Sequence, residues 1–85
     1  MIDGRHCTRK DLDLLINETN KVKLSINDIN LNAYYKLIAR FDQYTADELK
    51  RLISVTSSED EIRRIIDQKV YALKQSILVD IYEHQ

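Results

Sequence analysis

The sequence predicts a single all-α domain, and three observations support this. The 85-residue chain contains no proline and one glycine, Gly4, so neither residue interrupts a helix. Apolar residues recur at spacings of three and four, which is typical of amphipathic helices. A Ser or Thr followed three residues later by an acid recurs along the chain, and this pattern marks four helix starts. With 44% hydrophobic and 32% charged residues, the composition is that of one folded domain.

The four capping patterns divide the chain into four expected helices. They are Thr8 with Asp11, Ser25 with Asp28, Thr45 with Glu48, and Ser58 with Glu61. A hydrophobic staple is expected at two of these starts, pairing Leu24 with Ile29 and Tyr44 with Leu49, and Cys7 with Leu12 is a third candidate. The expected helices cover 9–22, 26–42, 46–54 and 59–83, and the last is the longest. Residues 1–7 are expected to form a flexible N-terminal arm, followed by a helical domain over 8–85.

The connections between these helices are short, which favours antiparallel neighbours in a compact four-helix domain. Each helix has one apolar stripe that would face the core. In chain order the expected stripes are Leu12, Leu15, Ile16 and Val22; Ile26, Ile29, Ala33, Leu37 and Phe41; Leu49, Leu52 and Ile53; and Ile62, Ile65, Ile66, Val70, Leu73, Ile77 and Ile81.

Two of the helices carry more apolar residues than one core face needs. In the last helix the extra residues lie opposite the main stripe, and a helix over 59–83 extends about 37 Å, against about 13 Å for 46–54. Its second half should therefore outrun its neighbours, and tyrosines favour interfaces. In the second helix the extra stripe has a simpler explanation, a central position with neighbours on two sides. The candidate partner or dimer interface comprises Tyr71, Leu78, Tyr82, Leu31, Tyr35 and Ile38.

The stretch from residue 45 to residue 66 has the helix, short turn and helix of a helix-turn-helix, so DNA binding is an alternative. The second helix, however, begins with Glu59, Asp60 and Glu61, which would repel phosphates from the helix end that otherwise attracts them. The charges are also spread evenly, with a net charge of −1, so nucleic-acid binding is not the favoured reading. Under this alternative the contacts would come from Arg63, Arg64, Arg5, Arg9 and Lys10.

The sequence offers little for catalysis. One cysteine excludes an internal disulfide, and one glycine excludes a phosphate-binding glycine loop. His6, Cys7 and His84 lack the spacing of a zinc site. We therefore expect no enzymatic activity, cofactor or metal. No secretory signal and no apolar run of about 20 residues is present, so we expect a cytoplasmic protein without a membrane span.

Together these observations predict a small, non-catalytic protein-protein interaction module acting as a regulator, inhibitor or adaptor. It would bind a protein partner, or a second copy of itself through the C-terminal helix, by an apolar, tyrosine-bearing helix face. The alternatives are a helix-turn-helix DNA-binding regulator and a small structural subunit of a larger assembly.

Overall fold

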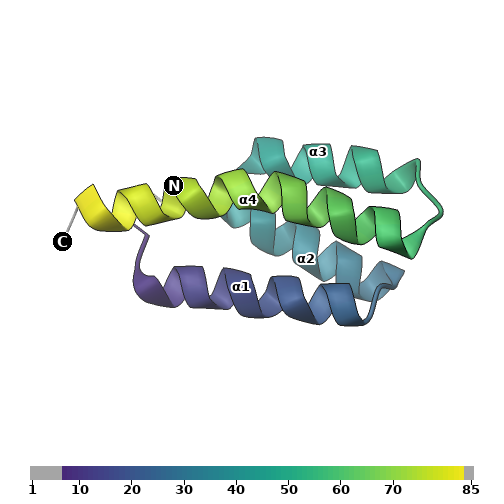
Figure 1. The fold of residues 1–85 in the computed structure, drawn as a ribbon, viewed down its shortest axis with the longest axis horizontal. Helices are drawn as coiled ribbons and strands as arrows, with labels where there is room; N and C mark the ends of the chain where they lie inside the picture. The colour runs from purple at the N-terminus through teal and green to yellow at the C-terminus, as the bar shows by residue number, and fades with distance from the viewer. Residues whose placement is uncertain (1–6, 84–85) are drawn as a thin grey trace.

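The structure is a computed structural model that describes residues 7–83. It contains four helices, α1 (Arg9–Leu24), α2 (Asp28–Phe41), α3 (Gln43–Ser54) and α4 (Glu59–Glu83), and no strand within those residues. Each helix runs antiparallel to the next, with α4 between α1 and α3 and in front of α2 (Figure 1). The expected all-α fold with a longest last helix is confirmed.

Two of the four predicted helix starts are confirmed. At α1 the Thr8 hydroxyl accepts the Asp11 N–H at 3.4 Å, and the Asp11 carboxylate accepts the Thr8 N–H at 2.8 Å. At α4 the Ser58 hydroxyl accepts the Glu61 N–H at 3.4 Å. These bonds satisfy amide groups that the first turn of a helix leaves without partners.

The other two predicted starts are wrong, because a nearby Asn or Asp acts as the cap. Asn27 accepts the Asn30 N–H at 2.9 Å, so α2 begins after Asn27 and not after Ser25. Asp42 accepts the Tyr44 N–H at 3.2 Å, so α3 begins at Gln43 and contains Thr45 within its first turn.

The two hydrophobic staples predicted at these starts are also wrong. Leu24 and Ile29 are 85% and 81% exposed, and neither belongs to the core. Tyr44 is exposed as well, whereas Leu49 is fully buried. A single residue, Asp42, separates α2 from α3, so these two helices form a tight hairpin.

α2 is rotated relative to the predicted orientation. Its buried residues are Leu31, Tyr34, Ile38 and Phe41, whereas Ile29 and Ala33 are exposed. The stripe of larger side chains faces inward because α2 packs against both α1 and α3 and must fill the space between them. α2 thus has neighbours on two sides, as does each of the other three helices.

A buried hydrogen bond between α1 and α2 accompanies this rotation. The hydroxyls of Thr19 and Tyr34 lie 2.7 Å apart, and the Thr19 hydroxyl donates to the Leu15 carbonyl at 2.7 Å. Tyr34 is therefore the donor to Thr19. A buried tyrosine needs such a partner, and this one brings the middle of α2 against α1.

Polar contacts with α4 hold α1 at both ends. At its C-terminal end the Arg63 Nε donates to the Lys23 carbonyl at 2.8 Å, and the Lys23 ammonium pairs with Asp67 at 2.7 Å. At its N-terminal end the Cys7 N–H donates to the Asp80 carboxylate at 2.7 Å. Cys7, which the sequence analysis placed in the N-terminal arm, is buried in the hydrophobic cluster.

The Thr19–Tyr34 pair should behave as a coupled unit. Tyr34→Phe is expected to cost about 0.5–1.5 kcal/mol, because Thr19 keeps its bond to Leu15. Thr19→Val is expected to cost more, about 1–3 kcal/mol, because it leaves the tyrosine hydroxyl buried without a partner. The double variant should be more stable than the sum of the single losses implies. Urea unfolding of the four proteins measures this, and strictly additive losses would contradict the bond.

Tyr34 should also make stability pH-dependent at alkaline pH. Burial raises the pKa of its hydroxyl from 10.0 to about 12. Below pH 10 the group is neutral in both states and its contribution is fully present. Between pH 10 and 12 the unfolded chain ionises while the folded chain does not, so roughly 2–3 kcal/mol of stability is lost. Tyr34→Phe lacks this loss, so its stability relative to the wild type should rise across that range in urea unfolding.

Candidate protein-interaction surface

The outward side of α4 carries no charge over about four turns. From residue 68 to residue 82 every exposed side chain of the helix is uncharged. The charged residues within that stretch, Lys69, Lys74 and Asp80, are half-buried at its margins. We call this surface the α4 uncharged face, and it comprises Gln68, Tyr71, Ala72, Gln75, Ser76, Val79 and Tyr82.

The exposed sides of the other helices differ. α1, α2 and α3 each place charged side chains among their exposed residues, as α3 does with Asp47, Lys50 and Arg51. Charged residues make up 32% of the chain, so their absence from one long helical face sets that face apart. Depletion of charge together with aromatic residues is the compositional mark of the centre of a protein interface.

The length of α4 contributes to this exposure. Its core stripe of Ile62, Ile66, Val70, Leu73 and Ile77 packs inward. Its C-terminal part extends beyond α2 and α3 and has α1 on one side (Figure 1). The expectation that α4 outruns α3 is therefore met, and the outward side of this segment has no covering helix within residues 7–83.

The three predicted interface residues of α4 differ in exposure. Tyr71 and Tyr82 are 64% and 73% exposed. Leu78 is half-buried and packs against the core, so the surface is shifted toward Val79, which is 53% exposed. The sequence analysis missed Val79 because Leu78 and Val79 are adjacent apolar residues, and apolar spacing alone does not show which of the two is exposed. Marking charged positions on the helix would have identified it.

The predicted interface residues of α2 are not a free surface. Leu31 and Ile38 are buried in the core, and Tyr35 is half-buried against it. Burial and the nearby Asp28 carboxylate raise the pKa of Tyr35. In this fold Leu31 and Ile38 are used between helices of the same chain, so they are removed from the candidate surface.

Two arginines of the DNA-binding alternative, Arg63 and Arg64, are engaged within the protein. Besides its bond to Lys23, Arg63 pairs with Asp60 at 3.1 Å and Glu59 at 3.4 Å. Arg64 pairs with Glu61 at 3.4 Å. Arg63 thus caps the end of α1, and three carboxylates surround the two guanidinium groups. Of the remaining candidates, Arg9 and Lys10 are exposed, and Arg5 lies outside the described residues.

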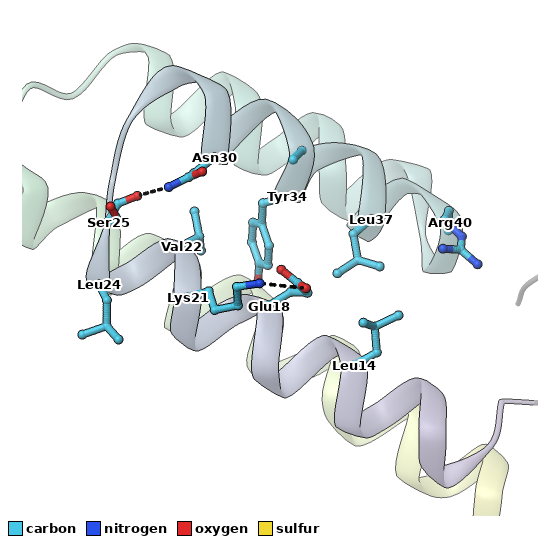
Figure 2. A pocket seen from close by; sticks show the side chains of 11 residues that line it. Leu14, Glu18, Lys21, Val22, Leu24, Ser25, Asn30, Tyr34, Leu37 and Arg40 are labelled. Atoms are coloured by element: carbon cyan, nitrogen blue, oxygen red, sulfur yellow. Dashed lines mark hydrogen bonds and ion pairs between the residues drawn. The ribbon is translucent and has the colours of Figure 1, made fainter.

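A second surface feature is a groove between α1 and α2 with a volume of about 690 Å³. Figure 2 shows the two helices diverging from their connection at Ser25, with Leu14 and Leu37 directed toward each other across the gap. Val22 and Tyr34 lie nearer the connection. Glu18 and Lys21 form an ion pair of 3.6 Å along the α1 edge. We call this feature the α1–α2 groove; its remaining lining residues are Leu24, Ser25, Asn30, Ala33 and Arg40.

Three structural features of residues 7–83 concern metal ligands, buried polar atoms and membrane spans. No three His, Cys, Asp or Glu side chains in this range are grouped to hold a metal ion. No buried side-chain nitrogen or oxygen in it lacks a hydrogen-bond partner. No helix in it is both long and apolar enough to cross a membrane.

The Cys7 thiol is buried at the N-terminal end of α1. Burial, and then the carboxylates of Asp80 and Asp11, raise its pKa. A thiol with a raised pKa is a poor nucleophile at neutral pH, because the thiolate is the reactive form.

In comparisons with known proteins, no protein-family model, no curated protein and no solved structure matches this chain.

The burial of Cys7 predicts slow thiol chemistry. The folded protein should react with a chromogenic disulfide reagent at least about tenfold more slowly than the same protein in urea, because the thiol is covered and protonated. Asp80→Asn removes one carboxylate next to the thiol and should speed the reaction of the folded protein. Equal rates in the folded and unfolded states would contradict the buried position.

Proposed function

We propose that this protein is a non-catalytic protein-protein interaction module, a small regulator, inhibitor or adaptor. The observation that carries the proposal is the α4 uncharged face. A face that only met water would have no reason to exclude charged side chains over four turns of helix. A face that packs against another protein excludes them because desolvating an unpaired charge is costly.

The spacing of the exposed residues suits contact with a helix of the partner. Tyr71, Gln75, Val79 and Tyr82 follow one another at intervals of three or four, the pattern of a seam between paired helices. Each tyrosine can bury its ring while its hydroxyl stays hydrated at the rim. The partner surface that fits this face is an apolar helix stripe without charges at its centre.

A different protein is favoured over a second copy of the chain. Two α4 uncharged faces packed together would bury a few hundred Å² on each side, against about 800 Å² per partner in a standard stable interface. A larger partner can add contacts beside α4. A homodimer through α4 is the other form of the same proposal. In either form we place the protein in the cytoplasm, where a free thiol such as that of Cys7 stays reduced.

Site-specific photo-crosslinking in the cells that make the protein tests this proposal. A photoreactive phenylalanine analogue replaces Tyr71 or Tyr82, and the control replaces Tyr44, a tyrosine of α3 that is 70% exposed. Discrete adducts are expected from both α4 positions and not from Tyr44. Adding Val79→Lys should abolish them while changing stability by no more than about 0.5 kcal/mol, because Val79 lies on the surface.

The adduct mass separates the two forms of the proposal. A mass of twice the chain indicates the homodimer, and any other discrete mass indicates a different partner. No adduct from Tyr71 and Tyr82, or the same adducts from Tyr44, would contradict the role of α4.

A further inference from the structure

No further inference is drawn: the strongest candidate, the α1–α2 groove, is lined by leucines and by charged residues of both signs, and nothing in the structure of residues 7–83 shows what covers it.

Discussion

The attachment of α1 to α4 is the constraint on which the surfaces of this protein depend. α1 is held at its C-terminal end by the Arg63 guanidinium and at its N-terminal end by the Asp80 carboxylate. A guanidinium bound to the last carbonyls of a helix satisfies groups that would otherwise need water. These contacts set the direction of α1, and the divergence of α1 from α2 that opens the groove follows from that direction.

The same contacts involve an arginine that the helix-turn-helix alternative would assign to DNA contacts. A recognition helix needs free cations near its first turns, and here those turns hold Glu59, Asp60 and Glu61. Arg63 points to the end of α1 and pairs with two of these acids. The Arg63 guanidinium joins α4 to the end of α1. The helix-turn-helix spacing in the sequence did not indicate this role.

The two surfaces that the bundle leaves open differ in chemistry. The α4 uncharged face is a convex stripe without charges, suited to a neutral apolar partner. The α1–α2 groove is lined by the leucines Leu14, Leu24 and Leu37 and by charged residues of both signs, Glu18, Lys21 and Arg40.

The sequence by itself determined the number and order of the helices, because hydrophobic spacing and capping residues act within a few positions of each other. It also determined the starts of α1 and α4, the exposure of Tyr71 and Tyr82, and the inward stripe of α4 from Ile62 to Ile77. These features depend on local hydrogen bonds or on the register of a single helix. The α4 uncharged face could also have been found in the sequence by tracing the positions of the charged residues around the helix.

Only the tertiary structure decided which face of α2 is buried and which cap begins α2 and α3. Each of these positions offered two nearly equal local solutions, such as Ser25 and Asn27 for one cap, and packing against neighbouring helices chose between them. The groove was likewise beyond sequence reasoning, because it lies between two helices and depends on the angle at which they meet. That angle is set by contacts between residues far apart in the chain, from Lys23 to Arg63 and from Cys7 to Asp80.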